Sequence, residues 1–179
     1  RTGYTLASWN TAANGSGTTY NLGANFTITA AATLYAQWTI NTYTVTYNGN
    51  SNTSGSVPVD ASSPYNYNSN VTVKTNSGTL ARTGYTFSGW NTAADGSGTD
   101  YAASGSATFA ISANTILYAK WSINSYTVSY DGNSNTGGSA PSSVTQNYNT
   151  TFATSTGGTL SRTGYTLASW NTAANGSGT

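Results

Sequence analysis

The sequence predicts a mostly β protein made of small domains in tandem, on the strength of three observations. The segment RTGYTLASWNTAANGSGT occupies both Arg1–Thr18 and Arg162–Thr179, and a near copy occupies Arg82–Thr99. Short runs alternate apolar and polar residues, as strands with one buried face do. Between these runs lie Gly- and Asn-rich segments that allow the positive φ angles of tight turns. The chain is therefore expected to consist of repeated, strand-rich units.

The repeats set the expected domain boundaries. Thr33–Ser56 aligns with Ile116–Ser139, beyond the segments already named. If a unit begins at its YTVTY-like run, residues 41–121 form one complete repeat. Residues 1–38 are then the C-terminal part of one repeat, and residues 124–179 are the N-terminal part of the next. Because the exact copies flank a variant copy, two repeat types are expected to alternate, as in an excerpt from a longer array.

Each unit is expected to hold four or five strands and little helix. The candidate strands of the complete repeat are Tyr43–Tyr47, Val71–Thr75, Gly84–Trp90 and Ile116–Trp121. In the second of these, Val71 and Val73 alternate with polar residues and are expected to face inward. The candidates for a helical turn are Asn91–Asp95 and Ala107–Thr115.

Large aromatic side chains are expected to fill the core of the complete repeat, because a small domain needs them to bury enough apolar surface. The expected core aromatics are Tyr85, Phe87, Trp90 and Trp121. Trp90 is out of phase with Tyr85 and Phe87, so Gly89 is expected to carry a bulge that turns Trp90 inward. The competing interpretation is that some of these rings form a platform on which a sugar stacks.

The composition narrows the range of partners. Only 5% of residues are charged and the net charge is +1, so no field of the kind that attracts nucleic acid is expected. No apolar run approaches the roughly 20 residues of a membrane-spanning helix, so no membrane span is expected in this segment. A surface of Thr, Ser, Asn and Gly without oxidisable Cys or Met suits a durable extracellular protein.

The residue types needed for catalysis are scarce. There is no His, Cys or Glu, which excludes a Ser–His–Asp triad, a thiolate nucleophile and the usual zinc ligands. Asp131–Gly138 begins like a calcium loop, but its glycine is displaced by one position and no Glu closes it. The matching loop begins with Asn48, so a polar turn is expected at both places. We therefore expect no enzyme, no cofactor and no metal site.

Three segments of the complete repeat carry a family resemblance. YTVTY, then RTGYTFSGWNTAADGSGTDY, then ILYAKW, is similar to the Listeria–Bacteroides repeat, also called the internalin B-repeat. The resemblance covers essentially the whole chain and implies small β-grasp-like domains in multi-copy bacterial surface proteins. The chain departs from the family pattern at NTAA (Asn91–Ala94), where a second aromatic and acidic residues are usual. A role that rests on a charged face is therefore not expected here.

The resulting functional hypothesis is structural: a linear array of repeats in an extracellular fibre, stalk or adhesin at the cell surface. Self-assembly into a filament is a further expectation, because another chain could add strands to exposed edges. The expected partners are neighbouring repeats or copies of the chain itself. Ile40, Tyr43, Ile123 and Tyr126 are the candidate contacts between units. The alternative is a binding module for a glycan or for a protein on a host or neighbouring cell.

Overall fold

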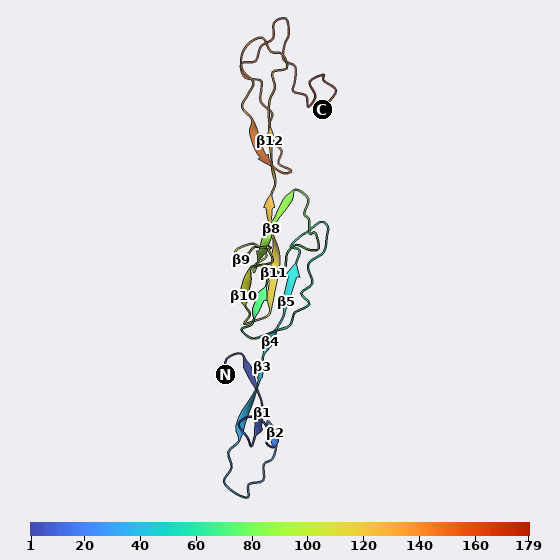
Figure 1. Cartoon of the computed structure of the whole chain (residues 1–179). Coiled ribbons are helices and arrows are strands. Elements are labelled where there is room, and N and C mark those ends of the chain that lie inside the picture. The colour runs from blue at the N-terminus through green and yellow to red at the C-terminus, as the bar shows by residue number, and fades with distance from the viewer. The chain divides into compact units, whose positions relative to one another are not determined.

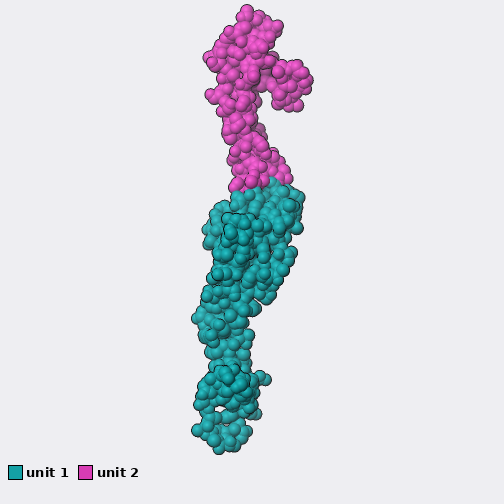
Figure 2. Space-filling view, in the orientation of Figure 1, with its two compact units in different colours: residues 1–82, 87–121 teal, residues 83–86, 122–179 magenta.

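The computed structural model describes residues 1–179 and contains strands, turns and loops but no helix (Figure 1). The expected mostly β class is confirmed, and the structure contains no helix at all. The chain divides into two compact units, residues 1–82 with 87–121 and residues 83–86 with 122–179 (Figure 2).

Neither candidate helical turn is helical. Asn91–Asp95 forms the end of a strand followed by bends and a turn, and Ala107–Thr115 contains the strand β10 (Thr108–Ala110). The physical reason at Asn91 is that its side chain bonds to nearby backbone groups, which competes with the backbone bonds of a helix.

Residues 1–40 form a three-stranded antiparallel sheet in the order β2-β1-β3. Its strands are β1 (Tyr4–Asn10), β2 (Thr19–Asn21) and β3 (Tyr35–Ile40). The pairing of β1 with β3 shifts by one residue between Leu6 and Ser8, which marks a β-bulge in β1. Such a bulge changes which side chains share a face of the sheet.

The complete repeat is organised around a four-stranded sheet in the order β5-β11-β8-β9. These strands are β5 (Val45–Asn48), β11 (Thr115–Ile123), β8 (Tyr85–Asn91) and β9 (Asp100–Tyr101). β5 and β11 are parallel, with Val45 opposite Thr115. A strand from the beginning of the repeat therefore pairs with one from its end, which closes the repeat into a single packed body.

Two short antiparallel pairs complete this repeat. β4 (Thr42–Tyr43) pairs with β6 (Tyr65–Asn66), and β7 (Asn70–Thr72) pairs with β10. The strand segments outnumber the four or five expected because several contain only two or three residues. Single-sequence periodicity does not detect segments of that length.

The core of the complete repeat draws on all these strands. Its buried residues are Val45, Tyr47, Val71, Val73, Leu80, Trp90, Ile111, Leu117 and Ala119. Val71 and Val73 are both fully buried, as the alternation predicts. Because large apolar side chains in contact provide most of the folding free energy, this cluster is the main source of stability in the repeat.

Gly89 allows Trp90 to enter that core. Its φ angle is 138°, and a Cβ at this position would lie 2.7 Å from the carbonyl oxygen of Tyr101. Along β8, residues alternate between partly buried and exposed up to Ser88 and are all buried from Gly89 to Asn91. The change of phase expected at Gly89 is thus present, and a residue with a side chain cannot occupy this position without displacing β9.

Unit 2 contains one strand pair, β12 (Ser125–Val128) with β13 (Val144–Asn147), in which Ser125 lies opposite Asn147. Isolated bridges join Gly137 to Ser161 and Arg162 to Tyr165. The residues of the last RTGYT copy carry no named strand.

Candidate functional site

The aromatic core of the complete repeat is centred on Trp90, which is fully buried. Its ring lies 4.7 Å from that of Tyr47 and 5.2 Å from that of Phe87, measured between centroids. Phe87 in turn contacts Trp121 at 5.6 Å. All three pairs are edge-to-face, the geometry in which the positive ring edge meets the negative ring face.

Two hydrogen bonds fix the depth at which these rings sit. Trp90 Nε1–H donates to the carbonyl oxygen of Lys74 at 2.9 Å. The backbone N–H of Lys74 donates to the Tyr47 hydroxyl, also at 2.9 Å. Burial raises the pKa of the Tyr47 hydroxyl. The two rings therefore hold one peptide segment after β7 by its main chain, independently of its side chain.

The same construction recurs in unit 2. The rings of Tyr130 and Trp170 lie 4.7 Å apart. Trp170 Nε1–H donates to the carbonyl oxygen of Ser155 at 2.6 Å, and the N–H of Ser155 donates to the Tyr130 hydroxyl at 3.0 Å. Ser155 takes the place of Lys74, which shows that the arrangement does not depend on the residue whose main chain is held.

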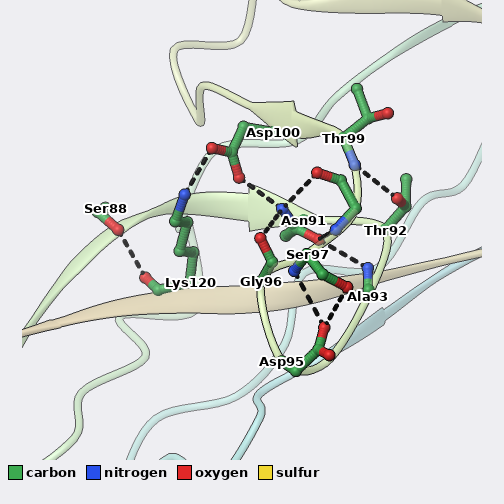
Figure 3. Close-up of polar contacts among 11 residues, drawn as sticks. Ser88, Asn91, Thr92, Ala93, Asp95, Gly96, Ser97, Thr99, Asp100 and Lys120 are labelled. Carbon is green, nitrogen blue, oxygen red and sulfur yellow. Dashed lines mark hydrogen bonds and ion pairs between the residues drawn. The ribbon is translucent and has the colours of Figure 1, made fainter.

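A loop organised by Asn91 follows the core strand β8 (Figure 3). The side chain of Asn91 is 1% exposed, and its Nδ2 donates to the carbonyl oxygens of Gly96 and Gly98 at 3.2 and 3.1 Å. Nδ2 also reaches Asp100 Oδ1 at 2.6 Å, and Oδ1 of Asn91 accepts from the N–H groups of Ala93 and Gly98. One amide group therefore bonds several backbone groups of the loop and a side chain of β9 at once.

All three copies of the segment build this loop. Asn10 and Asn171 make the bonds to the backbone that Asn91 makes, with the residue numbers shifted accordingly. A second side chain, at Asn14, Asp95 or Asn175, accepts from the serine two residues later through Oδ1 alone. The sequence analysis did not single out Asn91. In all three copies this asparagine follows a Trp and precedes two glycines at fixed distances, and this constant position was the available signal.

The carboxylates of this loop are exposed but bonded. Hydrogen bonds from the Ser97 hydroxyl and backbone lower the pKa of Asp95. The pKa of Asp100 is lowered by Lys120, whose Nζ lies 2.5 Å from Asp100 Oδ2, and by Asn91. In both cases the ionised form is the one that the folded loop favours.

We expect these two lowered pKa values to make the complete repeat sensitive to acid. A carboxylate with a lowered folded pKa contributes stability above its unfolded pKa, here near 3.8, and that contribution is lost as the pH falls through the folded value. Replacing Asp95 with Asn and Asp100 with Thr, as at Asn14 and Thr19, should reduce the acid loss. Thermal unfolding measured from about pH 6 down to about pH 2 tests this; equal slopes for both proteins would contradict it.

A further ion pair lies deeper. Lys74 Nζ is 3.1 Å from Asp60 Oδ1, and the side chain of Asp60 is fully buried. Asp60 Oδ2 accepts from the Tyr65 hydroxyl at 2.8 Å, and its Oδ1 accepts from the N–H of Ser62. Burial raises the pKa of the Tyr65 hydroxyl, with Asp60 adding to the shift. Asp60 therefore holds its own loop to β6 and to the segment after β7.

Phe87, Trp90 and Trp121 of the predicted core aromatics lie in or beside the core, whereas Tyr85 is not among the residues that pack against it. Trp90 is part of the buried cluster, and Phe87 and Trp121 pack against it while partly buried. Tyr85 is half-buried. Trp121 Nε1–H also donates to the carbonyl oxygen of Gly49 at 3.1 Å, so this ring is bonded to the turn after β5.

The four candidate contacts between units lie in different surroundings. Ile40 is the last residue of β3, opposite Tyr4, and Tyr43 lies 6.5 Å from Tyr67, ring to ring. Ile123 and Tyr126 are 42% and 57% exposed.

The turns at Asn48 and Asp131 are bonded by their own side chains. Asp131 Oδ1 accepts from the N–H of Asn133 at 2.7 Å, which is the polar turn expected there, and Asn48 bonds Asn50 in the same way. No group of three potential metal-ligating side chains is present. A cavity of about 430 Å³ lies in unit 2 between the turn at Asn133 and the segment Leu160–Ala168. No helix has the length and apolar character that crossing a membrane requires.

Fold and site together define a tandem-repeat β protein whose repeats are built around Trp–Tyr pairs and asparagine-centred loops. The chain belongs to the Listeria-Bacteroides repeat domain family, which matches it at residues 1–37, 43–120 and 126–179. This confirms the resemblance identified from the sequence.

Two relatives from Evansella cellulosilytica are similar over most of the chain. One, named as a Gly-rich membrane protein, is 43% identical over 161 residues, which are 84% of this chain and 17% of the relative. The other, named as a membrane protein, is 38% identical over 157 residues, 85% of this chain and 21% of the relative. The chain thus spans about a fifth of the length of these relatives. No solved structure matches it.

Proposed function

We propose that this chain is a structural segment of an extracellular surface fibre, stalk or adhesin, in which repeats provide length. The observation that carries the proposal is the recurrence of one construction: a Trp and a Tyr hold the main chain of Lys74 in one unit and of Ser155 in the other. Membership of a repeat family and relatives named as membrane proteins support a place at the cell surface.

We also propose that the segment has no catalytic role. Each of its four carboxylates is bonded within the fold: Asp60 to Lys74, Asp95 to Ser97, Asp100 to Lys120 and Asp131 to Asn133. A carboxylate used in this way organises a loop or an ion pair rather than standing free to exchange a proton with a substrate.

The glycan-binding alternative receives less support from the complete repeat. Its two tryptophans have their ring nitrogens bonded to the main chain, and the rings pack in or against the core. A sugar-stacking platform needs an aromatic face open to solvent. Trp9 and Trp38 are 37% and 39% exposed, but their counterparts Trp90 and Trp121 form part of that packing.

The structural role predicts that length grows with the number of repeats. Proteins carrying one, two or four copies of residues 1–161 in series should appear in electron micrographs as particles whose length increases linearly with copy number. Particles that become wider but not longer would contradict the proposal. A glycan array probed with the chain and with a Trp9→Ala variant serves as the control for the alternative, since a lectin would bind and lose binding in the variant.

A further inference from the structure

Asn41 occupies the short connection between β3 and β4 and is bonded on three sides. Its N–H donates to the carbonyl oxygen of Gly3 at 2.9 Å, and its own carbonyl oxygen accepts from the N–H of Tyr67 at 2.8 Å. Its Oδ1 accepts from the Thr5 hydroxyl at 2.7 Å. Gly3 and Thr5 belong to the first partial repeat and Tyr67 to the complete one, so this asparagine is bonded to both.

Two independent features require a glycine at position 3. Gly3 has a φ angle of 74°, a left-handed conformation that a residue with a side chain rarely adopts. In addition, a Cβ on Gly3 would overlap the ring of Tyr67. The ring therefore lies directly against the backbone of the preceding repeat, in space that only glycine leaves open.

Unit 2 contains the same set of contacts one repeat later. The N–H of Asn124 donates to the carbonyl oxygen of Gly84 at 2.9 Å, and its carbonyl oxygen accepts from the N–H of Tyr148 at 2.7 Å. Asn124 Oδ1 accepts from the Thr86 hydroxyl at 2.7 Å, and a Cβ on Gly84 would overlap the ring of Tyr148. Recurrence of all four contacts with matching distances indicates a specific interface.

We propose that these residues form an interface between consecutive repeats, in which the glycine of each GYT motif receives the tyrosine of the next repeat's NYN motif. The intervening asparagine locks the two together. The partner surface is thus another repeat of this chain, recognised by a bare glycine backbone and a threonine hydroxyl. This deepens the proposed structural role and rests on it, because it assigns the residues that restrict bending between repeats.

The chain supplies a matched control in Gly164. It is the glycine of the third GYT copy and has a φ angle of 78°, close to that of Gly3 and Gly84, but nothing lies within 4 Å of the position of its Cβ. An alanine at Gly164 carries the same backbone strain without a tyrosine to displace. The difference between the variants therefore isolates the contact with the ring.

The first experiment measures orientation across the interface at Asn41. The chain has no cysteine, so spin labels can be placed at Ala13→Cys and Ala94→Cys, which are equivalent exposed loop positions of successive repeats. A pulsed electron–electron distance measurement should give one narrow peak, which is lost in Gly3→Ala and kept in Gly164→Ala. A narrow peak that persists in Gly3→Ala, or a broad distribution in the unsubstituted chain, would overturn the proposal.

If Gly3→Ala or Gly84→Ala does not fold, a less disruptive variant still tests the interface. Thr86→Val removes only the hydroxyl bond to Asn124, and Thr166→Val is its control in the third copy. Amide hydrogen exchange at Asn124 and Tyr148 should accelerate in the first variant and stay unchanged in the second. Equal exchange in both would reject the interface.

If the interface passes these tests but particle length does not grow with copy number, the proposed function fails and the interface stands.

Discussion

Replacing Trp90 with alanine is expected to lower the free energy of unfolding of the complete repeat by about 3–5 kcal/mol. The side chain is fully buried, contacts the rings of Tyr47 and Phe87, and donates to the carbonyl oxygen of Lys74. Its removal leaves a cavity in the core and takes the hydrogen-bond donor from the carbonyl oxygen of Lys74. Urea denaturation followed by circular dichroism measures the change.

The control for this substitution is Trp9→Ala. Trp9 stands at the equivalent place in the first partial repeat but is 37% exposed. Its loss removes less buried surface, so a smaller effect is expected. Equal losses for Trp9→Ala and Trp90→Ala would show that burial of Trp90 does not provide the stability assigned to it here.

Replacing Asn91 with alanine is expected to cost about 1–3 kcal/mol, because several partly buried backbone groups lose their partner at once. Asn91→Asp should not restore the loss. The new oxygen would face the carbonyl oxygens of Gly96 and Gly98, which now accept from Nδ2. Thermal and urea unfolding of both variants measure the effect.

A second position of this loop, taken in the first copy, provides the contrasting control. Asn14 uses only its Oδ1, and Asp95 makes the same bonds in the complete repeat. Asn14→Asp should therefore change stability by no more than about 0.5 kcal/mol. A loop that tolerated Asn91→Asp as well as Asn14→Asp would contradict the role given to the Asn91 amide.

Local sequence patterns predicted those features that depend on neighbours in the chain. Alternation placed Val71 and Val73 inward, and the phase of GYTFSGW indicated the irregularity at Gly89 that buries Trp90. Turn composition identified the Asx turns at Asn48 and Asp131. Each of these is decided within a few residues of chain, which is the range over which periodicity and turn chemistry act.

Features that join distant residues were not predictable in the same way. The parallel pairing of β5 with β11 joins Val45 to Thr115, and no local signal states which strands will be neighbours. The contacts at Asn41 were not predictable for the same reason: the sequence indicated Ile40 and Tyr43 near this junction, whereas the bonds use Gly3 and Tyr67. The repeated NYN motif, at the same place in both repeats, was the available clue.

The hydrogen bonds between the Trp and Tyr side chains and main-chain atoms also affect how the genes of repeat proteins like this one can change. Because Lys74 and Ser155 are held through their N–H and carbonyl groups, different side chains can stand at that position without loss of these two bonds, although Lys74 itself also pairs with the buried Asp60. Residues 1–18 and 162–179 have the same amino-acid sequence, so a recombination event within these two copies would join halves that already fit. Strains of one species would then be expected to carry alleles that differ in repeat number, with every member of the series still able to fold.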